Sequence, residues 1–380
     1  MINIILLGLT SLLTDISSEM VYPLLPIFLV NTLGATPAIL GLIEGVAEST
    51  ASLLKVFSGY FSDRARLRKP FTIFGYASSA VGKFFLYMAT GWGCVLTARV
   101  ADRFGKGVRT APRDALIAES AKDGKRGAAF GLHRAMDTLG AAIGVFAAFF
   151  LITRFEGDLR KVFLLSLIPA FLGVLILFFV KEKKRASSGN TGKLSLRWRH
   201  LDKRLKAFLI FTFIFTLGNS SNQFLLLRAK NLGGSLPQVL LLYLTYNLVF
   251  SFVAYPAARL SDKIGRRKVL VLGYLFYGLV YLGFAVNSRL NILWFLFAFY
   301  GLYTGFTEGV EKALVSDMAP QELRATAIGL HATLVGIGLL PASLLAGLLW
   351  NYGGASLPFY VGGFFGIVAS VGFALVLKDL

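Results

Sequence analysis

Charged side chains inside long apolar segments are the residues of this sequence that could do chemistry. The apolar stretch 92–118 has the densest set, which consists of Arg99, Asp102, Arg103, Lys106, Arg109, Arg113 and Asp114. In a helix that turns about 100° per residue, all of them fall on one side. A charge at mid-depth of a bilayer costs about 2.5–3.5 kcal/mol on insertion scales, so lipid cannot face this side. We therefore expect it to line a polar cavity.

Carboxylates from other segments can reach the same cavity. Asp15 and Glu19, for example, lie one helical turn apart. A buried carboxylate beside an arginine can take up and release a proton, and the cation sets its proton affinity. Static ion pairs are the alternative, but desolvation can exceed their Coulomb attraction. The predicted substrate and proton pathway comprises Asp15, Glu19, Glu44, Glu48, Arg99, Arg103, Lys106, Arg134 and Asp137.

The C-terminal half has fewer charges inside its apolar segments. They are Glu308, Glu311, Lys312 and the edge-placed Arg259, and they lie among the aromatic residues Tyr243, Tyr246, Tyr300 and Tyr303. We expect the first half to handle charge and the second to offer a more apolar wall. Lys83 also falls near mid-depth, and the sequence does not identify its partner.

The sequence offers no catalytic or cofactor-binding pattern. Its only cysteine, Cys94, rules out a disulfide framework and a thiolate metal site. His133 and His331 hold matching positions near helix ends, where we expect them to form hydrogen bonds. No group of His, Cys and carboxylates suits a metal ion. Walker, Rossmann and nucleophile-elbow motifs are missing. We expect no enzyme, no cofactor and no ATP-driven step.

Composition shows where these charges must lie. The chain has 380 residues, of which 56% are hydrophobic and 16% charged, whereas globular chains average roughly 45–50% and about 25%. The apolar residues come in runs of about twenty, the length that crosses ~30 Å of hydrocarbon. This pattern excludes a soluble enzyme and a nucleic-acid binder, although the net charge is +19. It predicts an integral membrane protein.

Twelve membrane-spanning helices are predicted. Turn residues separate them, as at Gly34 to Pro37 and at Gly353-Gly354. The first apolar stretch continues into Asp15 without a cleavage signal, so we interpret it as part of helix 1. The expected helices are 4–30, 38–62, 71–90, 92–118, 127–153, 162–180, 206–228, 236–260, 269–287, 291–316, 325–350 and 356–377.

The distribution of Lys and Arg predicts the orientation. With the N-terminus inside, the inner segments carry more than half of the 39 cations, while the outer loops carry only Arg154, Arg160, Lys161, Arg228, Lys230 and Arg289. Both termini are therefore expected in the cytoplasm. The basic segment 181–206 divides the chain into six helices and six, and we interpret it as a flexible linker that can also contact anionic lipid.

The two halves repeat each other. RGAAFGLH at 126–133 aligns with RATAIGLH at 324–331, and SDR at 62–64 aligns with SDK at 261–263. Each motif lies at the same helix boundary in its half. A parallel six-helix repeat with a polar site between the halves is typical of transporters.

These motifs resemble the major facilitator superfamily over the whole chain. Its loop motif reads G-x-x-x-D-R-x-G-R-R, and the sequence has GYFSDRARLRK from residue 59 and ARLSDKIGRRK from residue 258. RFGKG at 103–107 is similar to the family's R-x-x-Q-G on helix 4. GAAIG at 140–144 is similar to the antiporters' G-x-x-x-G-P, without its proline. The resemblance implies an all-α fold of two pseudo-symmetric six-helix bundles, residues 1–180 and 207–380.

The loop motif also has a physical interpretation. Asp63 and Asp262 lie where a carboxylate can meet a neighbouring helix N-terminus, and the cations beside them can bind the inner membrane face. Anchoring alone explains the cations but not the repeated Asp. We therefore predict a conformational latch that comprises Gly59, Asp63, Arg64, Arg113, Asp262, Lys263, Arg266, Glu308 and Glu311.

We expect a secondary transporter of the cell membrane that works as a monomer, in contact with lipids, by alternating access. An ion gradient would drive it, and protons are the expected coupling ion. Proton-coupled efflux of a small molecule is favoured. Uptake (symport) of a small organic anion is the alternative, because arginine binds such groups bidentately. A receptor or scaffold that no longer transports is a third possibility, although a scaffold needs no charged interior.

Overall fold

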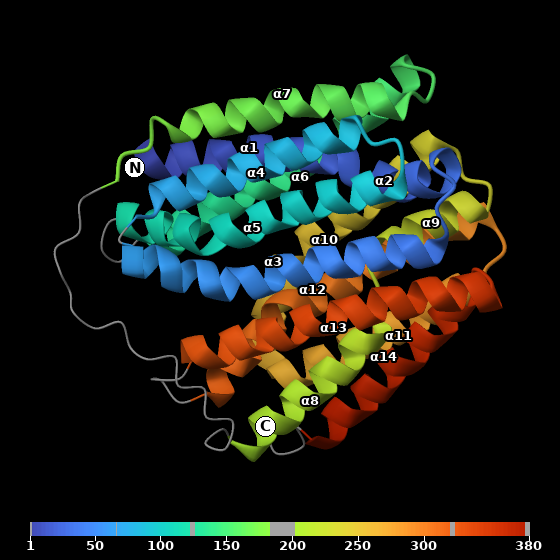
Figure 1. The fold of residues 1–380 in the computed structure, drawn as a ribbon. Coiled ribbons are helices and arrows are strands. Elements are labelled where there is room, and N and C mark those ends of the chain that lie inside the picture. Colours follow the sequence, from blue (N-terminus) through green and yellow to red (C-terminus); the bar gives the residue numbers. More distant parts are fainter. Residues whose placement is uncertain (1, 66, 122–125, 183–201, 320–323, 377–380) are drawn as a thin grey trace. The chain divides into compact units, whose positions relative to one another are not determined.

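The computed structural model describes residues 2–65, 67–121, 126–182, 202–319 and 324–376. Within these ranges every regular element is a helix, and no strand occurs (Figure 1). The all-α prediction is confirmed. Most of the predicted linker 181–206 lies outside the described residues. So do the side chains of Asp63 and of the first residues of the 126–133 and 324–331 repeats.

The chain forms two compact units. The first comprises residues 1–34 and 46–193, and the second residues 35–45 and 194–380. The boundary therefore passes through α3. The first unit contains most of α3 (Pro37–Ala65) and six other helices. These are α1 (Ile2–Val21), α2 (Leu25–Ile27), α4 (Lys69–Tyr87), α5 (Trp92–Ser120), α6 (Arg126–Arg154) and α7 (Leu159–Leu177).

The second unit has the same all-helical character. The beginning of α3 belongs to it because glycines there allow close packing: the Cα of Gly41 faces the backbone of Ser343, and Gly347 faces the backbone of Pro37. Its other helices are α8 (Lys203–Gly218), α9 (Gln223–Asn231), α10 (Leu236–Ile264), α11 (Arg266–Val286), α12 (Leu293–Met318), α13 (Arg324–Gly353) and α14 (Leu357–Val376).

Two of the predicted helices are interrupted. The first is α-helical only to Val21, and short 3-10, α and π turns continue it to Thr32. The cause is that Pro23 and Pro26 each lack the N–H that a regular helix needs. The predicted helix 206–228 is broken at residues 219–222, Asn-Ser-Ser-Asn, between α8 and α9. Irregular backbone at membrane depth is tolerated where it lines a cavity, so this break is a candidate binding position.

Eight helical segments in the described residues are long and apolar enough to cross a membrane. The protein is therefore a multi-pass membrane protein. The prediction of twelve spans is larger by four. It also counted α3, α4, α5, whose charges lower its hydropathy, and the interrupted pair α8 and α9, which have 16 and nine residues.

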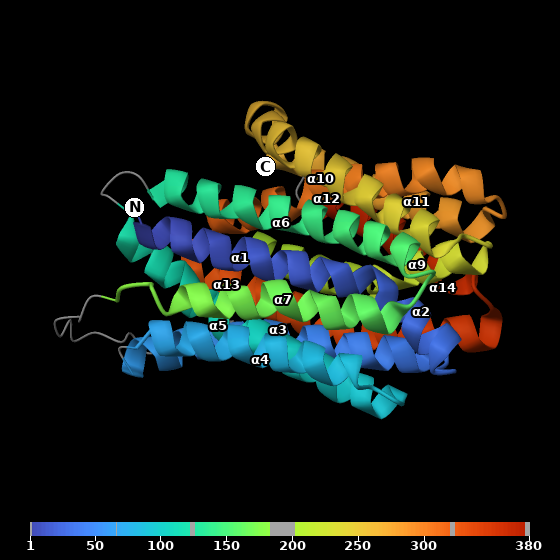
Figure 2. The same ribbon diagram turned by 90° about the horizontal axis from the view of Figure 1, so that it is seen from above.

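Close helix packing determines which side chains meet in the first unit. α1 runs beside α6 and α7, and α4 beside α5 (Figure 2). Gly140 and Gly144 on α6 face the carbonyl oxygens of Leu12 and Ile16 on α1, where a Cβ atom would overlap them. Small residues allow such close approach of helices in membranes. The pair thus fixes the register of α6 against α1.

Candidate functional site

The charged side of α5 forms the centre of an ion-pair network in the first unit. Arg99 Nη1 lies 3.4 Å from Asp102 Oδ2, and Arg103 Nη1 lies 3.9 Å from the same oxygen. Arg103 Nε also lies 2.9 Å from Glu48 Oε1 on α3. The residues Arg99, Asp102 and Arg103 are at most 8% exposed. A buried arginine therefore links two carboxylates from neighbouring helices.

Two further buried cations are held by neutral groups. Lys83 Nζ donates to the hydroxyls of Ser17 and Ser18 on α1, at 2.8 and 3.0 Å. This identifies the partners that the sequence left open. Arg109 donates to Ser79 Oγ, and its guanidinium lies 4.4 Å from the centre of the Tyr76 ring. Hydroxyl oxygens and an aromatic face stabilise these cations, which also interact electrostatically with Asp102.

A pair of carboxyl groups joins α1 and α6. Asp15 and Asp137 lie close enough to interact electrostatically. Asp137 Oδ1 accepts a 2.6 Å bond from Ser11 Oγ, and its Oδ2 lies 3.5 Å from Arg134 Nη1. Two carboxylates at close range repel each other, and a proton on one of them removes this repulsion, so the pair is a candidate proton-binding position. The α1–α6 register set by the two glycines brings the pair together.

The remaining pathway residues lie in different places. Lys106 interacts electrostatically with Asp15 and Glu48, and half-buried Glu19 interacts in the same way with Asp15. Glu44 belongs instead to the second unit, where it is fully buried and accepts a 3.3 Å bond from Ser221 Oγ, next to the break between α8 and α9. The structure thus brings the predicted pathway residues of the first unit together, and Glu44 precedes Glu48 by one turn of α3.

The second copy of the loop motif forms an ion-pair cluster within its unit. Arg266 at the start of α11 lies 2.7 Å from Asp317 at the end of α12 and 3.5 Å from Asp262 at the end of α10. Gly265 between α10 and α11 has φ +95°, a conformation that favours glycine. Exposed Lys263 is also part of this turn. The ends of three helices are therefore held at one point.

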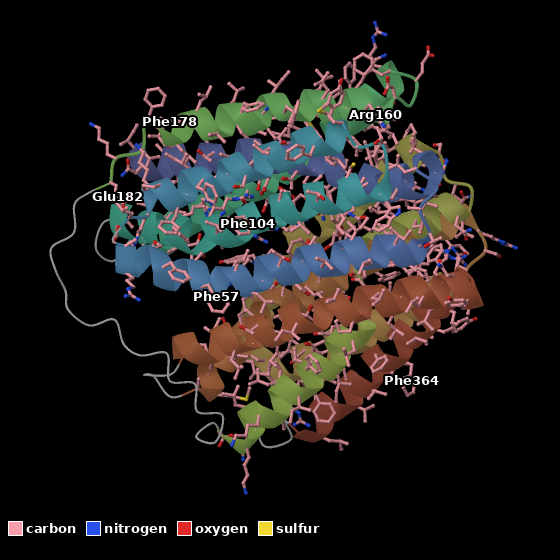
Figure 3. The ribbon with its side chains drawn as sticks, in the orientation of Figure 1. Phe57, Phe104, Arg160, Phe178, Glu182 and Phe364 are labelled. Atoms are coloured by element: carbon pink, nitrogen blue, oxygen red, sulfur yellow. The ribbon has the colours of Figure 1, made fainter. Side chains whose placement is uncertain are left out.

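The first copy is held by a residue that the sequence did not suggest. Glu182, just after α7 (Figure 3), accepts hydrogen bonds from the backbone N–H groups of Arg68 and Lys69 at 2.7 and 3.1 Å. It thus caps the N-terminus of α4. Arg68 also forms a 2.6 Å ion pair with Glu119. Of the predicted latch residues here, Arg64 is exposed, Gly59 faces Ala111 on α5, and Arg113 pairs with Asp114 at 2.8 Å.

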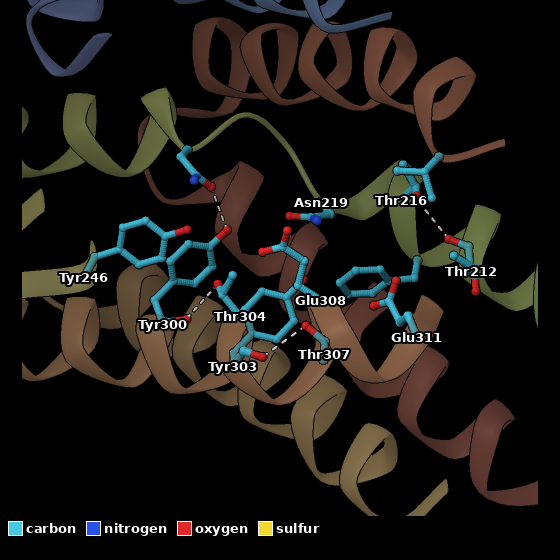
Figure 4. Close-up of a pocket in the computed structure, with 13 residues that line it drawn as sticks. Thr212, Thr216, Asn219, Tyr246, Tyr300, Tyr303, Thr304, Thr307, Glu308 and Glu311 are labelled. Carbon is cyan, nitrogen blue, oxygen red and sulfur yellow. Dashed lines mark hydrogen bonds between the residues drawn. The ribbon is translucent and has the colours of Figure 1, made fainter. Parts of the chain in front are cut away.

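A cavity of about 260 Å³ opens in the second unit (Figure 4). Side chains from α8, α10, α12 and α13, with the break after α8, surround it, and most of them are polar. Two of them are carboxylates, and the others bear hydroxyl, amide, aromatic or aliphatic groups. The residues are Thr212, Phe215, Thr216, Asn219, Asn222, Tyr246, Tyr300, Tyr303, Thr304, Thr307, Glu308, Glu311 and Val335.

Glu308 and Glu311 of α12 both line this cavity. Tyr274 OH donates to Glu311 Oε1 at 2.6 Å, and the buried His331 has Nε2 3.4 Å from Glu311 Oε2. Glu308 Oε1 lies 3.8 Å from Lys312 Nζ one turn along the helix. A sequence signal existed, since residues 304, 307, 308 and 311 recur at helical spacing and all are Thr or Glu.

Comparison with known proteins decides the family. The profile of the Major Facilitator Superfamily matches residues 7–226 and 207–379. The chain belongs to the Major Facilitator Superfamily. It is 40% identical over 356 residues to an MFS-type transporter of Methanocaldococcus jannaschii, covering 92% of this chain and 88% of that one.

More distant relatives agree with this assignment. The chain is 24% identical to the multidrug resistance protein MdtH of Photorhabdus laumondii, over 94% of its own length and 90% of the relative's. The crystal structure of the nucleoside transporter NupG has the same fold, with a TM-score of 0.83 at 13% identity and full coverage of both chains. This superfamily member is therefore a membrane transporter.

Proposed function

We propose that this transporter exports a small molecule in exchange for protons and that the Asp15–Asp137 pair carries the proton. The observation that supports the proposal is the close approach of these two carboxyl groups on α1 and α6, with Asp137 held by Ser11 and Arg134. When both members are deprotonated, two like charges face each other, and such an arrangement is unfavourable at low dielectric. Proton binding and release therefore change the stability of the α1–α6 contact.

The ion-pair network provides the means of coupling. Lys106 interacts with Asp15 and also with Glu48, the carboxylate that pairs with Arg103. When the aspartate pair is deprotonated, its negative charge attracts Lys106, the same cation that helps to neutralise Glu48. A substrate that alters the Arg103–Glu48 pair therefore alters how strongly the aspartate pair holds its proton. This competition would link substrate movement to proton movement.

Export is favoured over uptake by the similarity to a protein named for multidrug resistance. The arginines of α5 favour the alternative, proton-coupled uptake of a small organic anion, because Arg binds carboxylate and phosphate bidentately. In either case we propose twelve spans in bundles 1–180 and 207–380 that move by alternating access. We also propose cytoplasmic termini, a cell-membrane location and a monomer, since the Lys and Arg distribution supports this orientation.

Everted membrane vesicles with an acidified interior test the proposal. A pH-sensitive acridine dye reports the gradient while phenyltrimethylammonium or benzenesulfonate, a cation and an anion of similar size, is added. An exporter that exchanges protons dissipates the gradient when its substrate is present. We expect Asp15→Asn and Asp137→Asn to abolish this response, and Glu156→Gln, an exposed loop substitution, to retain it.

The outcomes separate the two candidate functions. A full response in both aspartate variants would contradict the assigned proton carrier, and a failure of both compounds to dissipate the gradient would contradict proton-coupled export of either. The alternative is tested with a proton gradient of the opposite sense. If the vesicles then accumulate benzenesulfonate, and Arg103→Gln abolishes this accumulation, the function is anion uptake and not export.

A further inference from the structure

We infer that the cavity of the second unit binds an organic cation with an aromatic or apolar body and that Glu308 is its counter-ion. The inference deepens the proposed function, on which it rests, by naming the substrate class. It depends on three features of the cavity: its balance of charge, its aromatic wall and the interrupted helix that closes one side.

The charge balance of the cavity is negative. Among the described residues that line it, Glu308 and Glu311 are acidic and none is basic. Glu311 is already engaged by Tyr274 and His331, which lie behind it. Glu308 has a 43% exposed side chain, and its contact with Lys312 is long, at 3.8 Å. An ammonium group in the cavity can therefore reach the exposed part of the Glu308 carboxylate.

Aromatic rings also line the cavity. The ring centres of Tyr246 and Tyr300 are 5.2 Å apart, and those of Tyr300 and Tyr303 are 5.4 Å apart. A cation over such faces gains about 0.5–2 kcal/mol, and quaternary ammonium groups are commonly recognised in this way. An anion would meet the negative faces of the same rings and two carboxylates. The wall thus discriminates by charge and accepts apolar bodies.

The break between α8 and α9 adds hydrogen-bonding groups for orientation. Asn219 and Asn222 come from this break, and Tyr300 OH donates to Asn222 Oδ1 at 2.7 Å, which holds the ring in place. In Figure 4 the Glu308 carboxylate points toward Asn219. Discontinuous helices form binding sites in many transporters because their irregular backbone leaves polar groups for a ligand. The carboxylate, amides and rings therefore converge on one volume.

Equilibrium binding to the purified, detergent-solubilised transporter tests the inference. The probes are tritiated phenyltrimethylammonium and benzenesulfonate. We expect saturable binding of the cation but not of the anion. Glu308→Gln should weaken cation binding at least tenfold, while Glu308→Asp keeps most of it. Tyr300→Phe preserves the aromatic face and should change binding less than threefold, whereas Tyr300→Ala should weaken it more than Tyr300→Phe does.

The controls make each result decisive. Glu156→Gln removes one negative charge from an exposed loop and should bind the cation as the wild type does. Gel filtration confirms that each variant is folded, and Glu308→Asp provides a second test at the same position. Equal binding of the anion, or wild-type cation binding by folded Glu308→Gln, would overturn the inference.

The proposed function and this inference can fail separately. Glu308-dependent cation binding without any effect on a proton gradient would retain the cation site and refute proton-coupled export. Proton exchange driven by benzenesulfonate, with no binding of the ammonium probe, would retain proton coupling and refute the cation site.

Discussion

The Arg103–Glu48 contact offers a quantitative test of the buried ion-pair network. Arg103 is 8% exposed, and its Nε lies 2.9 Å from Glu48 Oε1, whose side chain is 29% exposed. Arg103→Gln leaves Glu48 without this bond, whereas Asp102 retains Arg99 at 3.4 Å. Glu48 therefore loses its ion pair while Asp102 keeps its closer one, and a hydrogen bond to a charged group contributes about 1.5–3 kcal/mol.

This loss should appear as a lower melting temperature. One kcal/mol shifts the midpoint by about 2–4 °C in domains of 150–250 residues, so we expect Arg103→Gln to melt roughly 3–12 °C below the wild type. The assay is thermal unfolding of the purified protein followed by intrinsic fluorescence. Glu48→Gln alone should lower the melting temperature less than Arg103→Gln does, because the Arg103 guanidinium retains Asp102 at 3.9 Å.

The double variant Arg103→Gln/Glu48→Gln refines the test. Removing both partners leaves no uncompensated charge at this contact, so the double variant should be more stable than the two single effects predict when added. A double-mutant cycle with a coupling below about 0.5 kcal/mol would refute the reasoning. So would a melting temperature of Arg103→Gln that equals the wild-type value.

Two further predictions concern helix packing and capping. Gly140→Ala should destabilise by about 1–3 kcal/mol because its Cβ would overlap the Leu12 backbone. Gly131→Ala, on the same helix with open space at its Cα, should leave the stability unchanged. If the two variants had the same melting temperature, the α1–α6 register argument would be contradicted. Glu182→Gln should lower hydrogen-exchange protection at the amides of Arg68 and Lys69 by about 0.5–2 kcal/mol. Unchanged protection there would contradict the capping role.

The charged side of α5 could be predicted from the sequence because helical periodicity is a local property. Seven charges at helical spacing define one side of one helix, whatever that helix packs against. The cost of charge in lipid then requires that side to face protein or water. The structure buries Arg99, Asp102, Arg103 and Arg109 accordingly. The family could be predicted for a related reason, since its loop motif is a contiguous pattern.

Polar residues at a cavity are harder to predict than charges. The threonines of α8 and α12 and the asparagines of the break between α8 and α9 do not stand out from apolar runs, because Thr and Asn are tolerated in spanning helices. The aromatic residues nearby favoured an apolar interpretation. Only their convergence around one volume gave Glu308 and the tyrosines a common role.

The sequence by itself determined the membrane environment, the helical architecture, the family and the side of each helix that bears charge. The tertiary structure alone decided the partners: Ser17 and Ser18 for Lys83, Asp137 for Asp15, and His331 for Glu311. The physical reason is that periodicity acts within a helix. Pairing between helices depends on their register, which close contacts such as Gly140 against Leu12 set over long distances in sequence.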